Sequence, residues 1–223
     1  MTRIAHIEND MSDKFGIPRQ SGLAEEVIST IVFEPHYRNP DALKGLEEYS
    51  HIWLIWSFDP DNGSEDWSPM VRPPRLGGNT RMGVFATRSP NRPNPIGLSC
   101  VRLIGLENSD RGPLIHVAGA DLRNGTSILD IKPYLAYTDS HPDANSGFAA
   151  AHIQDSLDVV FPDSLKTGLS EDIIKAASAL LKYDPRPSYH DDPDRIYGMK
   201  YAGYDFRFRV NGSLLTVVEV EPG

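Results

Sequence analysis

The chain has 223 residues, of which 39% are hydrophobic and 24% charged, so it can form a core, and its net charge is -9. Its one cysteine, Cys100, excludes an intrachain disulfide, and its seven dispersed histidines have no ligand spacing, so no metal is expected. The chain begins without an apolar leader and has no run of about 18 apolar residues, which predicts a cytoplasmic protein without a membrane segment.

Short strands are predicted near the amino end. The segments 3–7 (RIAHI) and 27–33 (VISTIVF) contain β-branched residues, which favour strands. Between them, Phe15 and Ile17 can anchor a loop that presents residues 18–20 (PRQ). An ordinary surface turn is the alternative interpretation of this loop.

A helix and a central strand follow. Residues 39–49 (NPDALKGLEEY) begin with Asn and Pro, which are preferred at an N-cap and at the first helical position, so a helix is predicted. Residues 51–58 (HIWLIWSF) are almost continuously apolar, which predicts a strand buried on both faces. His51, at the edge of this strand, is more often a structural group than a catalyst. Asp59 and Asp61 lack the spacing of a calcium loop.

The segment 71–99 inverts the acidic charge of the chain. It holds five prolines, four glycines and no Asp or Glu, together with five arginines: Arg72, Arg75, Arg81, Arg88 and Arg92. Proline fixes φ and glycine permits positive φ, so a rigidly bent loop is predicted. Guanidinium groups on such a frame suit bidentate binding of phosphate or carboxylate.

Further strands complete a β-rich first part. The segments 96–107, 113–122 and 127–134 carry strand patterns separated by polar turns, which predicts antiparallel pairing. Cys100 lies in the first of them and is interpreted as a buried structural thiol, not a nucleophile. Because strands dominate and helix is scarce, the first part is predicted to be an antiparallel barrel or sandwich that spans residues 1–140.

The rest of the chain divides into a linker and a small mixed unit. Residues 141–169 are rich in Asp, Ser, Pro and Ala, which is typical of an irregular crossover. An amphipathic helix is predicted over residues 170–182, capped by Ser170. An alternating strand, an Asn-Gly turn at residues 211–212 and a second strand then indicate a hairpin. Residues 170–223 are therefore predicted to form a helix-plus-hairpin domain.

No common catalytic motif appears in the chain. A Walker loop, a dinucleotide-binding glycine fingerprint, a zincin histidine pair and a Gly-x-Ser-x-Gly elbow are all missing from the sequence. Loops at 18–20, 71–99 and 121–132 are rich in arginine, asparagine and small residues, and they can converge at one end of a small β-fold. Such a site suits a polar, partly anionic small molecule and an RNA or phosphate group. Residue spacing alone goes no further.

A set of long motifs, taken in order, resembles one family. KFGIPRQ (14–20), VRPPRLGGN (71–79), GVFATRSPNRPNPIGLS (83–99) and GADLRNGTSILDIKPYL (119–135), together with the C-terminal hairpin, resemble the longer bacterial type of the TrmO family, also called TsaA-like or YaeB-like. The resemblance covers nearly the whole chain. It implies a mainly β fold, with a small antiparallel β-barrel domain followed by a small α+β domain, and a homodimer.

The resemblance also implies a reaction and a cofactor. Members of the family use S-adenosylmethionine to methylate the N6 nitrogen of N6-threonylcarbamoyladenosine, beside the anticodon of tRNA. The cofactor contacts that it implies are Pro18, Arg19, Gln20, Phe58, Asp59, Arg88, Leu98, Gly125, Thr126, Ser127 and Ile128. The family more often has Asp where this chain has Asn124, and Pro where it has Ser127. Backbone contacts would survive both changes, whereas a role for a carboxylate at position 124 would not.

The substrate nitrogen must lose a proton, and Asp121, Asp130 and Tyr134 are the candidates for a base or an orienting acceptor. For both aspartates, a structural role at a strand end is the alternative. The candidates for electrostatic contact with tRNA are Arg72, Arg75, Arg81, Arg92, Arg186, Lys200, Arg207 and Arg209. Arginines of the segment 71–92 can instead serve a subunit contact, and Arg207 and Arg209 can lie on a solvated hairpin face.

Two other classes of function stay open. A non-catalytic module that binds S-adenosylmethionine or RNA is compatible with the lack of an identified base, and it would bind without methyl transfer. A hydrolase that uses His51 with an aspartate would turn over without S-adenosylmethionine.

Overall fold

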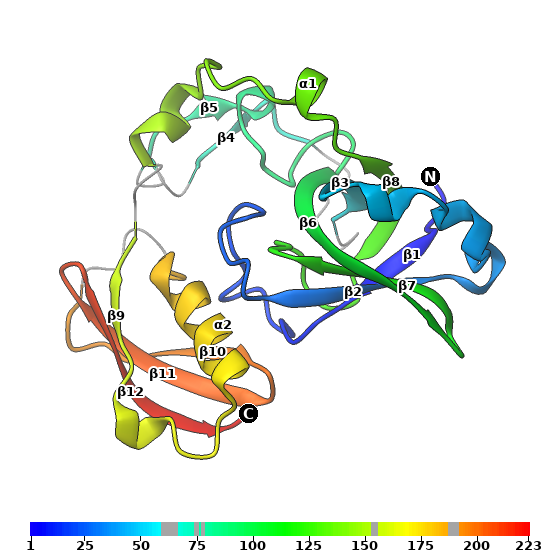
Figure 1. Cartoon of the computed structure of the whole chain (residues 1–223). Helices are drawn as coiled ribbons and strands as arrows, with labels where there is room; N and C mark the ends of the chain where they lie inside the picture. The colour runs from blue at the N-terminus through cyan, green and yellow to red at the C-terminus, as the bar shows by residue number, and fades with distance from the viewer. Residues whose placement is uncertain (59–66, 74–75, 77–78, 153–155, 187–191) are drawn as a thin grey trace.

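The computed structural model describes residues 1–58, 67–73, 76, 79–152, 156–186 and 192–223. Six strands form a closed antiparallel barrel in the amino-terminal part (Figure 1), which confirms the mainly β prediction. Their order around the barrel is β1 (Ala5–Glu8), β2 (Ile28–Phe33), β7 (Gly112–Ala118), β6 (Ile96–Ser109), β3 (His51–Ser57) and β8 (Ser127–Pro133). Between β1 and β8 the closure consists of two residue pairs, Ala5 with Ile128 and His6 with Ser127.

Alternate residues of the strands fill the barrel with apolar side chains, as a period of two requires. Its fully buried members include Ile7, Ile31, Ile52, Leu54, Ile115 and Ile128. The prediction that β3 is buried on both faces is wrong, because its even-numbered residues are buried and its odd-numbered residues are half-buried. The outer face is covered in part by α1 (Ala136–Asp139), whose Asp139 Oδ2 accepts a hydrogen bond from Trp53 Nε1 at 2.9 Å.

The single helix predicted over residues 39–49 is also wrong. The segment forms two short 3-10 helices, η2 (Pro40–Leu43) and η3 (Leu46–Glu48), which are separated by Gly45 at φ 88°. Asn39 caps the first of them, since its side chain accepts from a backbone N–H two residues later at 3.0 Å. The start signal was therefore correct, and a glycine in the left-handed region ended the helix early. Among the residues that the structure describes, the other 3-10 helices with given bounds are η1 (Pro35–Tyr37), η6 (Val84–Ala86), η7 (Gly147–His152) and η8 (Asp163–Leu165).

The arginine-rich segment contains a small two-stranded ribbon. β4 (Met70–Val71) pairs with β5 (Met82–Gly83) in an antiparallel register. Arg72 and Arg81 flank this pairing, and both side chains are exposed. Two predicted site residues, Asp59 and Arg75, lie outside the described residues.

The C-terminal part is a four-stranded sheet with one long helix on it (Figure 1). Its strands, in spatial order, are β10 (Tyr197–Tyr201), β11 (Tyr204–Asn211), β12 (Leu214–Pro222) and β9 (Asp158–Val160), and the helix is α2 (Glu171–Lys182). The predicted helix cap is confirmed, because Ser170 Oγ accepts from Ile173 N at 3.3 Å. The predicted hairpin is confirmed as β11 and β12. β9, which pairs in parallel with β12, extends the sheet from a segment predicted to be irregular.

The hydrophobic core of this second sheet also contains residues from near the start of the chain. Met11, Ala24 and Val27 are buried in it together with side chains of α2 and the sheet. Phe15 and Ile17 pack against the same core. The segment that leads from β1 to β2 therefore belongs structurally to both parts of the molecule.

Candidate active site

Two adjoining hollows lie where loops leave one end of the barrel. β3 ends there, β6 and β8 begin there, and β7 ends there, because neighbouring strands are antiparallel. The smaller hollow, of about 390 Å³, is lined by Pro18, Arg19, Gln20, Trp56, Phe58, Arg88, Arg92, Ile96, Gly97, Leu98 and Asp121. The larger, of about 520 Å³, is lined by Lys14, Ile17, Trp56, Ser57, Phe58, Pro90 and residues 121–127. Trp56, Phe58 and Asp121 border both hollows, so the two form one candidate site.

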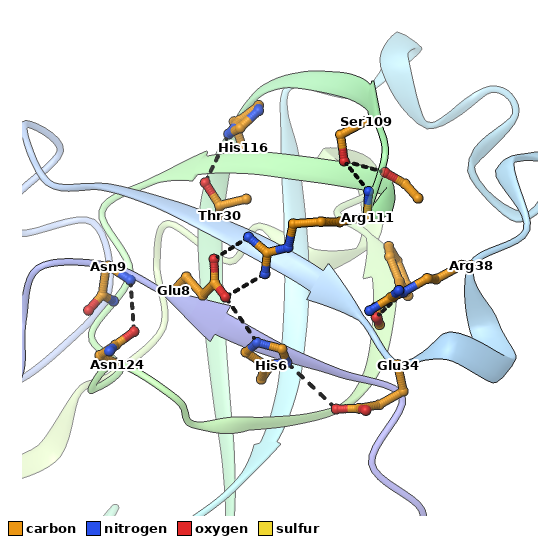
Figure 2. A network of polar contacts seen from close by, with 12 residues as sticks. His6, Glu8, Asn9, Thr30, Glu34, Arg38, Ser109, Arg111, His116 and Asn124 are labelled. Atoms are coloured by element: carbon orange, nitrogen blue, oxygen red, sulfur yellow. Dashed lines mark hydrogen bonds and ion pairs between the residues drawn. The ribbon is translucent and has the colours of Figure 1, made fainter.

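The loop 121–127 is fixed to β1 and to the segment that follows β1. Gly125, at φ 82°, donates its N–H to Ile7 O at 2.8 Å, and Asn124 N donates to Met11 O at 2.9 Å. Asn9 secures the loop twice, since its backbone N–H donates to Asn124 Oδ1 at 3.1 Å (Figure 2) and its side chain donates to Leu122 O at 2.9 Å. The wall of the larger hollow is thus held in place from behind.

A chain of hydrogen bonds ends on Asp121. Trp56 Nε1 donates to Ser99 Oγ at 2.9 Å, and Ser99 Oγ donates to Asp121 Oδ1 at 2.5 Å. Trp56 and Ser99 are both buried, so this chain is shielded from water. Each hydroxyl and indole N–H has a partner, as buried polar groups require. The hydrogen bond from Ser99 therefore helps to orient the carboxylate, together with backbone hydrogen bonds from Asp121 itself and from Ser21.

Burial raises the pKa of the Asp121 carboxyl above its ordinary value of 3.8. The hydrogen bond from Ser99 opposes this rise, and so, to a lesser degree, does the positive charge of Arg88. A carboxylate with a raised pKa beside a cavity is a candidate acid or base with a physical rationale.

Arg88 is held by the loop that contains residues 18–20. Its Nη1 donates to Gln20 Oε1, and Arg88 itself remains exposed. Arg92 serves the loop in a different way, because its Nη2 donates to Val84 O at 3.3 Å and to Thr87 O at 3.1 Å. Both arginines line the smaller hollow. Arg88 is exposed there, whereas Arg92 supports the backbone of its own segment.

Comparison with known proteins decides which family has this arrangement. Residues 6–140 match the profile of the tRNA-methyltransferase O N-terminal domain, and residues 155–223 match that of the TrmO C-terminal domain. The chain belongs to the TrmO family.

Relatives of known name span nearly the whole chain. The tRNA (adenine(37)-N6)-methyltransferase of Escherichia coli is 35% identical over 99% of this chain and 97% of its own. A Pseudomonas aeruginosa protein named for S-adenosylmethionine-dependent methyltransferase activity, RcsF, is 37% identical over 99% of this chain and 96% of its own. A crystal structure of TrmO from Pseudomonas aeruginosa matches with a TM-score of 0.77 and 31% identity, over 99% of this chain and 100% of that one.

The structure brings most of the predicted cofactor residues to the two hollows. Pro18, Arg19, Gln20, Arg88 and Leu98 line the smaller one, Gly125, Thr126 and Ser127 line the larger one, and Phe58 borders both. Leu98 is 54% exposed and so offers an apolar surface at the rim. Ile128 differs from the rest, because its side chain is buried in the barrel core. A cofactor contact from position 128 would have to come from its backbone.

The three candidate bases do not lie together. Asp121 borders both hollows, whereas Asp130 and Tyr134 line neither of them. Asp130 forms an ion pair with Lys132 at 3.2 Å, and Tyr134 packs with its ring 5.7 Å from that of Trp53. For Asp130 this ion pair agrees with the structural alternative that sequence analysis left open, and neither Asp130 nor Tyr134 lies at the hollows. Of the three candidates, Asp121 is the one whose position suits a base or an orienting acceptor at the hollows.

His51 does not support the hydrolase hypothesis. It begins β3, whereas the hollows are bordered by the other end of that strand. Its Nδ1 bonds to Ser50 Oγ at 2.9 Å, and its ring packs 6.1 Å from that of Tyr134. Cys100 is half-buried, and burial raises the pKa of its thiol, which fits a structural residue.

The predicted tRNA contacts in the C-terminal part divide into two groups. Arg186 is 9% exposed and forms an ion pair with Asp184 at 2.8 Å, which leaves little of its guanidinium available to a phosphate. Arg207 lies beside three carboxylates, of Asp205, Glu219 and Glu221, at 2.8–3.4 Å, which compete with any phosphate. The exposed residues Lys200 and Arg209 stay candidates for RNA contact.

Sequence analysis missed several residues of the site. Trp56 belongs to the predicted strand 51–58 and Ser99 ends the motif 83–99, but the hydrogen bonds that connect them to Asp121 join segments distant in the sequence. Lys14, at the start of the motif 14–20, and Arg123, between Asp121 and Gly125, also line the larger hollow. No helix in the described part of the chain is long and apolar enough to cross a membrane, and its His, Cys, Asp and Glu residues form no cluster suited to a metal.

Proposed function

We propose that this chain is a cytoplasmic enzyme that uses S-adenosylmethionine to methylate the N6 nitrogen of N6-threonylcarbamoyladenosine at position 37 of tRNA. The observation that carries the proposal is the position of Asp121, a carboxylate with a raised pKa that borders both hollows. The family match over both parts of the chain supports the reaction class.

The residues around the hollows suit the chemical groups of S-adenosylmethionine. Arg88 offers a guanidinium to the carboxylate of the cofactor. Trp56 and Phe58, whose ring centroids are 4.3 Å apart, offer an apolar and aromatic wall to the adenine. Asp121 adds a negative charge near which the sulfonium is favoured. When bound, the cofactor supplies an electrophilic methyl group.

Asp121 is the group that we propose takes the proton from N6. Ser99 donates a hydrogen bond to Oδ1 of this carboxylate, which borders both hollows. Loss of the N6–H proton would place it on the Asp121 carboxylate and leave the electron pair on N6 for the new bond to the methyl carbon. As that bond formed, the bond from the carbon to the sulfonium sulfur would break, and its electron pair would stay on sulfur. General base catalysis of this kind contributes about 10²–10⁴ to a rate, and positioning in the site contributes the rest.

The tRNA would be held by arginines and lysines that the structure leaves exposed. Arg72 and Arg81 flank the β4–β5 ribbon, and Lys200 and Arg209 lie on the C-terminal sheet. Such contacts neutralise phosphates and carry little sequence information. The homodimer implied by the family resemblance is tested by measuring the mass of the particle in solution.

The experiment that tests the proposal uses methyl-labelled S-adenosylmethionine and two preparations of tRNA, with and without the threonylcarbamoyl group. We expect label only on the modified tRNA. Equal labelling of both preparations would contradict the substrate, and label on neither would contradict the reaction. The non-catalytic module predicts the latter result together with measurable binding of cofactor or tRNA.

A further inference from the structure

Arg19 reaches from the loop at the hollow into the C-terminal part of the chain. Its Nη2 donates to Asp184 O at 3.2 Å and to Arg186 O at 3.0 Å. These two carbonyls belong to the turn that follows α2. The arginine of the predicted cofactor loop therefore holds protein backbone 165 and 167 residues away.

The turn that Arg19 grips is itself rigid. Asp184 has φ 46°, in the left-handed region, and its Oδ1 accepts from Arg186 N at 3.2 Å and from Arg186 Nε at 2.8 Å. Asp184 Oδ2 accepts from Arg186 Nη2 at 2.9 Å. The guanidinium of Arg186 also lies 5.8 Å from the ring of Tyr197 on β10. The two carbonyls are thus presented in a fixed geometry.

The other end of the loop is anchored to the same part of the molecule. Gly16 has φ 96°, and a Cβ on it would lie 2.6 Å from Met199 Cγ of β10, so only glycine fits there. The ring of Phe15 stacks 6.5 Å from that of Phe208 on β11. Residues 15–19 are therefore shaped by the C-terminal sheet and its turn.

From Arg19 the contacts continue to the hollow. Gln20 Nε2 donates to Arg19 O at 2.5 Å, and Gln20 Oε1 accepts from Arg88 Nη1. Arg88 is the residue that we assign to the cofactor carboxylate. Its position therefore depends on a series of contacts that begins at residues 184–186.

We propose that Arg19 is a positioning residue, which ties the loop 18–20 to the C-terminal turn so that Gln20 holds Arg88 in place for the cofactor. The C-terminal part then completes the cofactor site of its own chain, in addition to any contact with tRNA. This inference rests on the proposed function, since it concerns binding of S-adenosylmethionine.

The test is calorimetric binding of two ligands to the full-length chain and to Arg19→Ala. The ligands are S-adenosylmethionine and its decarboxylated analogue. We expect Arg19→Ala to weaken S-adenosylmethionine by about tenfold and the analogue little, because the effect reaches the ligand through Arg88 and the cofactor carboxylate. An equal loss for both ligands would show a general disturbance of the site and overturn the proposal, as would an unchanged affinity for both ligands.

A second set of variants keeps the test informative if Arg19→Ala unfolds. Gly16→Ala keeps the Arg19 side chain but displaces the same loop from its other end, and we expect the same selective loss for S-adenosylmethionine. Arg3→Ala is the matched control, since Arg3 pairs with Glu34 at 2.6 Å, and neither residue borders the hollows. Arg19→Ala combined with Arg88→Ala should bind no more weakly than Arg88→Ala alone, because both act through one contact. Additive losses would contradict the proposal, whereas a wild-type chain that binds neither ligand would contradict the proposed function instead.

Discussion

At the scale of single residues, Asp121 combines two opposed influences. Burial disfavours its charged form, whereas the hydrogen bond from Ser99 and the charge of Arg88 favour it. The net result is a raised pKa, so the carboxylate is a stronger base than an aspartate in water. A group in this position costs the fold stability at neutral pH, because its ionised form is buried.

Asp121→Asn should lower the rate of methyl transfer by about 10²-fold or more, while cofactor binding persists. In the folded chain the pKa of Asp121 lies above its ordinary value of 3.8. The ionised carboxylate therefore destabilises the fold at pH values above the folded pKa, and this cost disappears at pH values below 3.8. The variant should therefore unfold at higher urea than wild type at pH 7, and the gain should shrink as the pH falls toward 3.8. Normal turnover by this variant would remove Asp121 from the mechanism.

Ser99→Ala tests the hydrogen bond that opposes the effect of burial. Its removal should raise the pKa of Asp121 further, since Ser99 stabilises the ionised form. The acidic limb of the pH–rate profile of kcat/KM should move to higher pH, and the rate at neutral pH should fall. Cys100→Ala is the control, because this neighbour on β6 does not contact Asp121. A profile unchanged by Ser99→Ala would contradict the assignment of the acidic limb to Asp121.

At the scale of elements, the pairing of β3 with β6 allows the site to form. Trp56 lies opposite Gly97, and a Cβ at position 97 would be 2.1 Å from Trp56 Cε2. The indole therefore lies across the backbone of β6, where its Nε1 reaches Ser99. Glycine is required at this position because of close approach, not because of a special φ.

Gly97→Ala should displace the indole and break its hydrogen bond to Ser99. We expect a loss of about 1–3 kcal/mol in the free energy of unfolding, which is the usual cost of overpacking. Denaturation in urea measures this loss, and kcat should fall because Asp121 loses its oriented partner. Gly83→Ala is the matched control, since a Cβ there meets nothing within 4 Å. Equal stability of the two variants would contradict the account of Trp56.

The elements that sequence analysis predicted well are those whose signals are local. The cap at Ser170 and the Asn-Gly turn specify α2 and the hairpin within a few residues. The errors arose where tertiary contacts decide. Gly45 broke a helix whose start was correctly identified, and β9 became a strand because β12 offers it an edge.

At the scale of the whole molecule, the chain separates its charges. Its net charge is -9, yet the segment 71–99 has no acidic residue and exposes Arg72 and Arg81. An acidic body with a local cationic surface limits binding of nucleic acid to one orientation. Arg186 has the same charge but is buried against Asp184, so it adds nothing to that surface.

Arg72→Ala and Arg81→Ala should each weaken tRNA binding and reduce the slope of log affinity against log salt by about 1. Titration of labelled tRNA at several salt concentrations measures both quantities. Arg102→Ala is the comparison, because Arg102 pairs with Glu25 at 3.0 Å on another part of the barrel. An unchanged slope in both variants would move these arginines to a subunit contact or to a structural role.

Most residues that line the candidate site belong to the family motifs, and the strand topology explains why these motifs lie close together. Antiparallel strands bring the loops after β3 and β7 and before β6 and β8 to one end of the barrel. Sequence could not separate Asp121 from Asp130, because the difference lies in burial and in Ser99, which is distant in the chain. The domain boundary near residue 140 stays a prediction. The sequence did not indicate that the segment 11–27 packs into the C-terminal core.

The barrel closure has a consequence for how ligand binding can be observed. β1 and β8 share two residue pairs, and the same seam is continued by Ile7 N donating to Thr126 O and Gly125 N donating to Ile7 O. Thr126 and Gly125 also line the larger hollow. The seam between β1 and β8, which has two residue pairs, therefore continues into the wall of the site. S-adenosylmethionine should therefore slow amide hydrogen exchange at these positions more than across β6 and β7. Binding of the ligand would thus stabilise the seam at which the barrel is closed.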